Sequence, residues 1–177
     1  MDDRIKVLIS EDEIKSRVAE LAVAINADYR GKALKLICVL SGAVLFMADL
    51  VKRLEMDVQI DFIHASSYGA ETKSSGIVKI THDLKTPITG EHVLLVEDIV
   101  DSGNSIHRLK KHLLEQKPDS LKVCTMLDKP ERREIPGITP EYIGFSIPNE
   151  FVIGYGLDYN QRYRHLPFVG VLPKELI

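Results

Sequence analysis

The stretch VLLVEDIVDSGNSI (residues 93–106) decides the fold that the sequence predicts. Its first four residues form an uninterrupted apolar run, which is typical of a strand buried on both faces of a parallel sheet. Acids and then small residues follow the run, and we expect a helix from about Ser105 to Gln116. A buried strand, a short polar loop and a helix in this order form the repeating unit of an α/β sheet.

The polar part of this stretch has the composition of a phosphosugar site. Three carboxylates, Glu97, Asp98 and Asp101, follow the apolar run. Neighbouring carboxylates suit sugar hydroxyls and a magnesium ion. Small residues that open a helix can turn main-chain N–H groups and hydroxyls toward one anion, and the helix N-terminus adds a partial positive charge. We expect a phosphate monoester to be cradled by Ser102, Gly103, Asn104 and Ser105.

Competing motifs for this stretch fit the residues less well. A solvated acidic turn before a capped helix contains the same residue types, although it does not require the whole string. The sequence contains no GxxxxGK[ST] and no GxGxxG motif, so it gives no sign of a nucleoside-triphosphatase loop or a dinucleotide fingerprint. Asp98 and Asp101 are three positions apart, which does not match the DxD of a haloacid-dehalogenase-type nucleophile.

Strands and helices alternate on both sides of this stretch. Ser10 and Glu13 form a capping-box pattern, so a helix should begin near Glu11 and end before Gly31. Apolar periodicity predicts a second helix over residues 43–55 and strands over residues 34–40, 58–65, 77–84 and 121–127. The alternation predicts an α/β fold with a central, mainly parallel twisted sheet flanked by helices.

The strand predicted at residues 58–65 alternates between apolar and polar side chains. One face should lie against the core and carry Val58, Ile60 and Phe62. The opposite, wetter face should carry Gln59, Asp61 and His64.

The length of 177 residues suits a single domain. We expect its core over about 32–140 and a small lobe over one end, made from about 1–30 and 141–177. The strand-like pieces at 142–148, 151–156 and 166–172 fall outside the alternation and suit that lobe. Because ligands bind beyond the carboxyl ends of strands in open α/β sheets, the site should involve the polar loops at 41–42, 66–76, 97–105 and 128–133.

The composition excludes several classes of partner and environment for this protein. Lys and Arg number 23 against 26 Asp and Glu, and the net charge of −3 disfavours general attraction to nucleic acid. Cys38 and Cys124 lie in apolar runs and should be small buried hydrophobes rather than part of a disulfide framework. The N-terminus does not have the pattern of a signal peptide, and the longest apolar stretch is too short to cross a bilayer. We therefore expect a cytoplasmic protein without a membrane partner.

Four segments resemble one enzyme family in order and spacing. VEDIVDSGNS (96–105) is similar to the phosphoribosyl-pyrophosphate signature of the type I phosphoribosyltransferases. ASSYG (65–69), MLDKPERR (126–133) and GFSIPNEFVIGYGLDYNQRYRHLP (144–167) resemble the hypoxanthine-guanine branch. The resemblance implies the fold of that family and a glycosyltransferase of purine salvage. Its reaction moves phosphoribose from 5-phosphoribosyl-1-pyrophosphate to hypoxanthine or guanine, giving IMP or GMP and pyrophosphate, with Mg2+ as cofactor.

The resemblance also implies roles for the acids and the loop of the signature. Glu97 and Asp98 match the acids that contact the ribose hydroxyls and the metal-bound sugar. Asp101 matches the catalytic acid beside purine N7, which is assigned as general base. Residues 101–105 match the loop that wraps the 5′-phosphate.

Further roles fall on the C-terminal half. Lys129 matches the lysine that bonds the 6-oxo group, Phe151 the aromatic that stacks on the purine, and Val152 the residue whose main chain reads its edge. Asp158 matches a carboxylate tied to a second magnesium and the base pocket, so the implied metal residues are Glu97, Asp98 and Asp158. Arg164 matches the arginine that holds pyrophosphate.

Two loops complete the implied site. Ser66, Ser67 and Tyr68 match a flexible lid that closes over the reaction, which suits a cation that water would otherwise attack. Ser41 and Gly42 stand where the family usually has a basic residue before glycine. That loop binds pyrophosphate largely through main-chain amides, so the function can survive without the cationic side chain.

Three alternatives stay open at this point. The same scaffold could use xanthine or another base. The fold also resembles transcription-attenuation regulators that bind RNA, although a basic face would then be expected. Taken singly, Phe151 could be a core residue and Lys129 a solvated loop charge. The apolar character of residues 43–54, and the family, suggest a homodimer or homotetramer.

Overall fold

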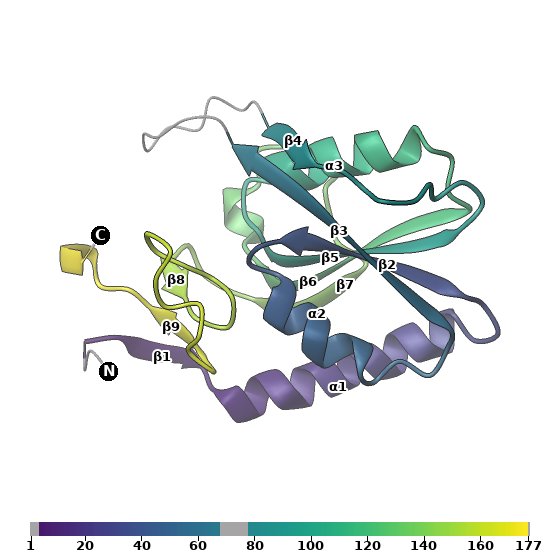
Figure 1. The fold of residues 1–177 in the computed structure, drawn as a ribbon. Coiled ribbons are helices and arrows are strands. Elements are labelled where there is room, and N and C mark those ends of the chain that lie inside the picture. Colours follow the sequence, from purple (N-terminus) through teal and green to yellow (C-terminus); the bar gives the residue numbers. More distant parts are fainter. Residues whose placement is uncertain (1–3, 68–77, 177) are drawn as a thin grey trace.

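The structure is a computed structural model that describes residues 4–67 and 78–176, and a six-stranded sheet forms its centre (Figure 1). The strands are β2 (Leu34–Leu40), β3 (Val58–Ser67), β4 (Val78–His82), β5 (His92–Val100), β6 (Ser120–Asp128) and β7 (Tyr142–Ser146). They lie in the order β4-β3-β2-β5-β6-β7. All neighbours are parallel except β4, which is antiparallel to β3 at one edge.

The direction in which the chain crosses the sheet reverses at β2. The chain passes from β2 outward to β3 and β4, and then continues on the other side of β2 with β5, β6 and β7. The loops that leave β2 and β5 diverge toward opposite faces, which opens a crevice at the carboxyl ends of these two strands. Ser41 and Asp101 directly follow the two strands and line this crevice.

Helices cover both faces of the sheet (Figure 1). The helices α1 (Glu11–Asp28) and α2 (Val44–Val51) pack on one face, and α3 (Asn104–Leu114) packs on the other. The predicted capping box at the start of α1 is confirmed: the Ser10 hydroxyl accepts from the Glu13 amide, and the Glu13 carboxylate accepts from the Ser10 amide. Its predicted apolar side is buried, namely Ile14, Val18, Leu21, Ala22 and Ile25.

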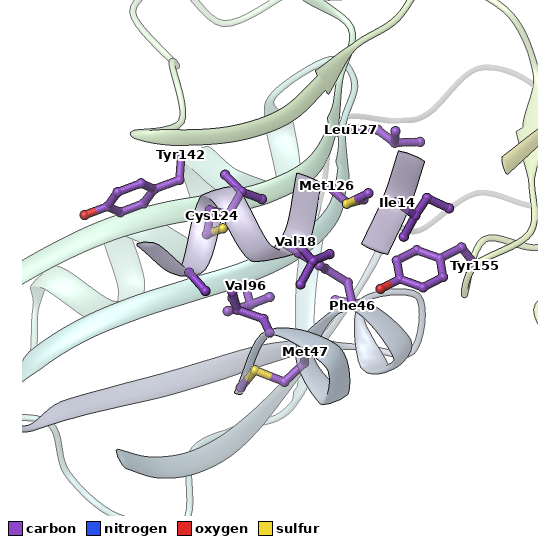
Figure 2. Close-up of a cluster of buried hydrophobic side chains, with 14 of the residues drawn as sticks. Ile14, Val18, Phe46, Met47, Val96, Cys124, Met126, Leu127, Tyr142 and Tyr155 are labelled. Carbon is purple, nitrogen blue, oxygen red and sulfur yellow. The ribbon is translucent and has the colours of Figure 1, made fainter. Parts of the chain in front are cut away.

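The larger hydrophobic cluster lies between the helices α1 and α2 and the sheet (Figure 2). Side chains of α1 and α2 meet Val96 of β5 and Cys124 and Met126 of β6 there. Cys38 and Cys124 are free thiols and fully buried, as predicted. Burial raises the pKa of the Cys38 thiol to about 12 and also raises that of Cys124, so neither thiol is readily ionised.

The two ends of the chain form a small antiparallel sheet in the order β1-β9-β8 (Figure 1). Its strands are β1 (Lys6–Ile9), β8 (Val152–Ile153) and β9 (Val169–Val171), and the short 3-10 turns are η1 (Pro130–Arg132) and η2 (Lys174–Leu176). The predicted fold class, a mainly parallel sheet with a small terminal lobe, is confirmed. The observed lobe is smaller than the predicted one, which comprised residues 1–30 and 141–177. The helix α1 packs on α2, and β7 pairs with β6 in the main sheet, so neither belongs to the lobe.

The predicted faces of β3 are confirmed only in part: Val58 and Phe62 pack against the core, but Ile60 is exposed, Asp61 is buried, and His64 shares the face of Val58 rather than opposing it. Asp61 is 4% exposed and Ile60 is 47% exposed. The Asp61 carboxylate accepts from the amides of Phe62 (2.8 Å) and Lys85 (3.0 Å), so the segment after β4 covers this side of the strand. Alternation shows which residues share a face, but the covering segment decides which face is buried. Burial of the Asp61 carboxylate is tolerated because it accepts hydrogen bonds from two amides.

Two strands extend further than the sequence predicted. β5 continues through Val100, so Glu97 and Asp98 lie within the strand rather than after it. β3 includes Ser66 and Ser67, which pair with Lys79 and Val78, while Tyr68 and the rest of the predicted lid lie outside the described residues. Within the ranges 4–67 and 78–176, no helix is both long enough and apolar enough to cross a membrane.

Candidate functional site

A cavity of about 320 Å³ opens at the carboxyl ends of β2 and β5. Its walls come from the β2–α2 loop, the end of β5, the start of α3 and the small lobe. Ten of the residues that the sequence singled out line it: Ser41, Gly42, Glu97, Asp98, Asp101, Ser102, Gly103, Ser105, Asp158 and Arg164. Positions more than 100 residues apart in the chain therefore face one space.

Gly42 is the tightest point of this cavity wall. A Cβ atom at residue 42 would overlap with the carboxylate of Asp98. Gly156 of the small lobe approaches from the other side, and a Cβ there would overlap with the carbonyl oxygen of Gly42. Gly156 also has a φ of +98°, which L side chains rarely adopt. Two glycines thus let the β2 loop, the β5 end and the small lobe meet without a gap.

Two adjacent acids, Glu97 buried and Asp98 half-buried, give the cavity an acidic wall. Glu97 is 6% exposed, and the Asp98 side chain lines the cavity beside it. Burial raises the pKa of Glu97 well above its ordinary value, and repulsion from Asp98 adds to the effect. Burial also raises the pKa of Asp98, while bonds with Glu97 and the amide of Ile99 and the charge of Arg164 oppose that rise. A cation or a set of hydroxyl donors is the natural complement of this pair.

The loop of small residues at positions 102–105, the small-residue loop, is stabilised by hydrogen bonds with the segment after β6. Gly103 caps α3 in the left-handed region with a φ of +88°, close to the Arg133 side chain. The Ser102 carbonyl accepts from the Glu134 amide at 2.9 Å, and the Glu134 carboxylate accepts from Asn104 Nδ2 at 2.8 Å. Asn104 therefore supports the loop rather than lining the cavity, unlike its neighbours Ser102, Gly103 and Ser105.

A second cavity, of about 580 Å³, adjoins the first. Lys129, Phe151 and Val152, the predicted base-pocket residues, all line it. Phe151 meets Tyr159 in an edge-to-face arrangement at 5.6 Å between ring centroids, and at 41% exposed its ring is still open to a ligand. Burial lowers the pKa of Lys129, and the attraction of Asp101 raises it again. Apolar walls with a few polar groups suit a flat heterocycle.

Asp101 lies where the two cavities meet. It lines both of them, together with Ile99. Arg132 Nε lies 2.9 Å from Asp101 Oδ1, and Arg133 Nη1 donates to the Asp101 carbonyl at 2.7 Å. A carboxylate at this junction can reach groups bound in either cavity.

Asp158 and Arg164 pair with each other at the wall of the first cavity. Arg164 Nη2 lies 2.7 Å from Asp158 Oδ1, and Arg164 Nη1 donates to the Gly156 carbonyl at 2.7 Å. Within the described ranges, no three acidic, histidine or cysteine side chains form a group that could hold a metal ion alone. Glu97, Asp98 and Asp158 are therefore not one preformed cluster, since Asp158 is taken up by Arg164.

The Glu97–Asp98 pair still fits a magnesium ion. Magnesium is usually bound by one or two carboxylates, with water and substrate phosphates as the other ligands. Two adjacent carboxyl groups whose ionised forms repel each other are the groups that such an ion would stabilise in the ionised form.

The sequence reasoning missed several residues that shape this site. Arg132 and Arg133 hold Asp101, Gly156 meets Gly42, and Glu134 holds the small-residue loop. The run of charges after Lys129, at the end of a strand beside β5, was the available signal for three of them. No sequence signal pointed to Gly156, because its role depends on a contact between segments that are distant in sequence.

Known proteins with this sequence pattern and shape are phosphoribosyltransferases. The family described as a phosphoribosyl transferase domain matches residues 10–160. The chain is 48% identical over 172 residues to the hypoxanthine phosphoribosyltransferase of Escherichia coli (strain K12), covering 96% of each chain. A hypoxanthine-guanine phosphoribosyltransferase structure from Bacillus anthracis has a TM-score of 0.91 at 48% identity, covering 96% of this chain and 100% of that one. The Trypanosoma cruzi hypoxanthine phosphoribosyltransferase in complex with the product IMP has a TM-score of 0.90 at 42% identity, covering 97% and 96%.

Replacing Glu97 by Gln should stabilise the metal-free protein at about pH 8. Because the pKa of Glu97 is raised in the folded state, the folded protein keeps a proton that the unfolded chain loses above the ordinary value of 4.5. The stability of the parent should therefore fall as pH rises above 4.5, by about 1.36 kcal/mol per unit of raised pKa. The variant lacks this loss, so the two proteins should converge toward pH 4.5.

Urea unfolding in the presence of a chelator, at a series of pH values, measures this difference. Glu131→Gln is the matched control, because Glu131 is exposed on η1. Equal stability of the Glu97→Gln variant and the parent across the whole pH range would contradict the electrostatic picture of the pair.

Proposed function

This chain belongs to the phosphoribosyltransferase family, in its hypoxanthine(-guanine) branch, and we propose how its two cavities share the purine-salvage reaction of that branch. The reaction moves phosphoribose from 5-phosphoribosyl-1-pyrophosphate to hypoxanthine or guanine and releases pyrophosphate. The phosphosugar occupies the cavity at the ends of β2 and β5, and the purine occupies the adjoining cavity. The observation that carries this assignment is the position of Asp101, which lines both.

The first cavity binds the phosphosugar through complementary charge. The 5′-phosphate lies at the start of α3 on Ser102, Gly103 and Ser105, where the amides of a first helical turn lack intrahelical partners. Arg164 and the main chain of Ser41 and Gly42 hold the pyrophosphate, since a guanidinium suits phosphate oxygens. Glu97 and Asp98 accept hydrogen bonds from the ribose hydroxyls.

The second cavity binds the purine. The purine ring lies on the exposed part of the Phe151 ring, and the Val152 main chain contacts its edge. Lys129 donates to the 6-oxo oxygen; its buried stem and cavity-facing position suit a single directed hydrogen bond. The 6-oxopurines hypoxanthine and guanine share these features, and the relatives, which are named for these two bases, favour them over the RNA-binding alternative.

Asp101 and the acidic pair serve the chemical step in different ways. The sugar carbon gains positive charge as pyrophosphate departs, and the negative field of Glu97 and Asp98 stabilises that charge. The purine loses the proton of N7 to Asp101, which acts as general base, while N9 attacks the sugar carbon. Holding both reactants on either side of one carboxylate also removes much of the entropic cost of bringing them together.

A bound magnesium ion would neutralise part of the negative charge of the pyrophosphate. Glu97 and Asp98 would hold it on the sugar side, with the remaining ligands taken from the substrate. Asp158 would contribute on the pyrophosphate side, where its bond with Arg164 already places both groups at the cavity wall.

We also propose that residues 1–177 act as one domain and assemble as a homodimer or homotetramer in the cytoplasm. The assembly is supported by α2, on which Val44 and Leu45 are 41% and 37% exposed. The compartment is supported by two buried free thiols, which suit a reducing environment.

Steady-state turnover tests the assigned reaction directly. With 5-phosphoribosyl-1-pyrophosphate and Mg2+, the protein should convert hypoxanthine to IMP and guanine to GMP, and xanthine more slowly. Release of pyrophosphate provides an independent readout. A protein that turns over none of the three bases, but is retained on heparin, would favour the RNA-binding alternative.

Asp101→Asn should lower kcat by about 10²–10⁴-fold, the usual contribution of a positioned general base. The KM for 5-phosphoribosyl-1-pyrophosphate should change far less, because the amide keeps the shape of the carboxylate. Initial rates with hypoxanthine at several pH values measure both parameters. A loss of less than about tenfold at every pH would remove Asp101 from the base role.

Gly42→Ala should impair pyrophosphate handling more than any change at Ser41. The added Cβ would overlap with the Asp98 carboxylate, so the loop or that acid must move. Displacements of this size in an active site cost about 10²-fold in rate. The product-inhibition constant of pyrophosphate and kcat are compared with those of Ser41→Ala, whose side chain is exposed. If both variants behave like the parent, the close approach at Gly42 does not matter for the reaction.

A further inference from the structure

Arg132 interacts with the side chain of Asp101 in an unusual way. Its Nε lies 2.9 Å from Asp101 Oδ1. That oxygen is buried, and among the described residues it has no hydrogen-bond partner of good alignment. The interaction is therefore one of charge, and it leaves hydrogen-bonding capacity on the carboxylate.

The position of Arg132 is fixed from several sides. Its amide donates to the Lys129 carbonyl at 3.1 Å, and its Nη1 donates at 3.4 Å to Oδ1 of Asn149, which lines the second cavity as well. The next residue, Arg133, donates to the Asp101 carbonyl and pairs with buried Asp128. Two successive arginines thus hold Asp101, one at its side chain and one at its main chain.

Lys129 shares this cavity wall and is attracted to the same carboxylate. Its side chain is 6% exposed, and within residues 4–67 and 78–176 it forms no hydrogen bond or ion pair. The charge of Asp101 raises the pKa of Lys129, which burial lowers, and the charge of Arg132 lowers it as well. Arg132 occupies Asp101 and repels Lys129, and both effects oppose a pair between Asp101 and Lys129.

Resting on the proposed base role of Asp101, we infer that Arg132 is a positioning residue that keeps Asp101 and Lys129 apart. Each of the two then faces the purine cavity as a separate group, one to accept a proton and one to donate a hydrogen bond. Without Arg132, Lys129 and Asp101 would pair across the cavity wall, and both would be lost to the substrate.

A double-mutant cycle between Arg132 and Asp101 tests this inference. The variants are Arg132→Gln, Asp101→Asn, their combination, and Arg132→Lys, which keeps the charge. Arg132→Gln should lower kcat with hypoxanthine about tenfold, which corresponds to about 1.4 kcal/mol of transition-state stabilisation, and leave the KM for 5-phosphoribosyl-1-pyrophosphate within about twofold. Arg132→Lys should recover part of the loss. In the Asp101→Asn background, Arg132→Gln should cost less than about twofold.

The outcomes separate the inference from the role of Asp101. Equal losses from Arg132→Gln in both backgrounds indicate a structural role and overturn the inference, as does an unchanged kcat in the single variant. If Asp101→Asn itself keeps most of its kcat, the base assignment is wrong and the inference falls with it. Glu131→Gln, one position earlier on η1 and exposed, controls for changes to the turn, and thermal unfolding of each variant controls for folding.

Discussion

The rest of the site depends on the contact between Gly42 and the Asp98 carboxylate, with Gly156 behind it. Three segments converge there: the loop after β2, the end of β5 and the small lobe. Any side chain at residue 42 or 156 would force them apart, because backbone and carboxylate atoms already fill the space. Asp158 and Arg164 reach the first cavity only because the lobe packs this closely, and Tyr155 strengthens the contact by donating to Asp49 of α2 at 2.9 Å.

The order of the strands explains why this convergence occurs at β2 and β5. These strands are neighbours, yet the chain leaves them toward opposite faces of the sheet, so the loops that follow β2 and β5 separate and leave a space between the strand ends. The terminal lobe covers that space instead, since β1 and β9 pair outside the main sheet. The sheet order therefore creates the opening, and the lobe turns the opening into a cavity with a charged wall.

The sequence predicted what depends on neighbours along the chain and failed where distant segments decide. The capping box of α1, the apolar strands and the small-residue loop follow local rules, and the structure has them. The side of β3 that carries Asp61 was predicted to face solvent. That prediction failed because the sequence pattern cannot show that the segment before β5 covers this side. Likewise, the assignment of β7 to the small lobe failed because its parallel pairing with β6 has no local signature. Arg132 and Arg133 were visible only as charges, and their contacts with Asp101 required the fold.

Two of the strongest electrostatic features of the site lower the stability of the empty protein. Burial of Glu97 beside Asp98 raises the pKa of both, which means that their ionised forms are disfavoured without a positive partner. Lys129 is likewise buried without a side-chain partner among the described residues, and burial lowers its pKa. Groups held in this way gain the most from a ligand that supplies the missing charge or hydrogen bond, because the cost of desolvating them has already been met during folding. The selectivity of the site for a charged phosphosugar and a polar purine edge thus follows from the same burial that makes the unliganded cavity unfavourable.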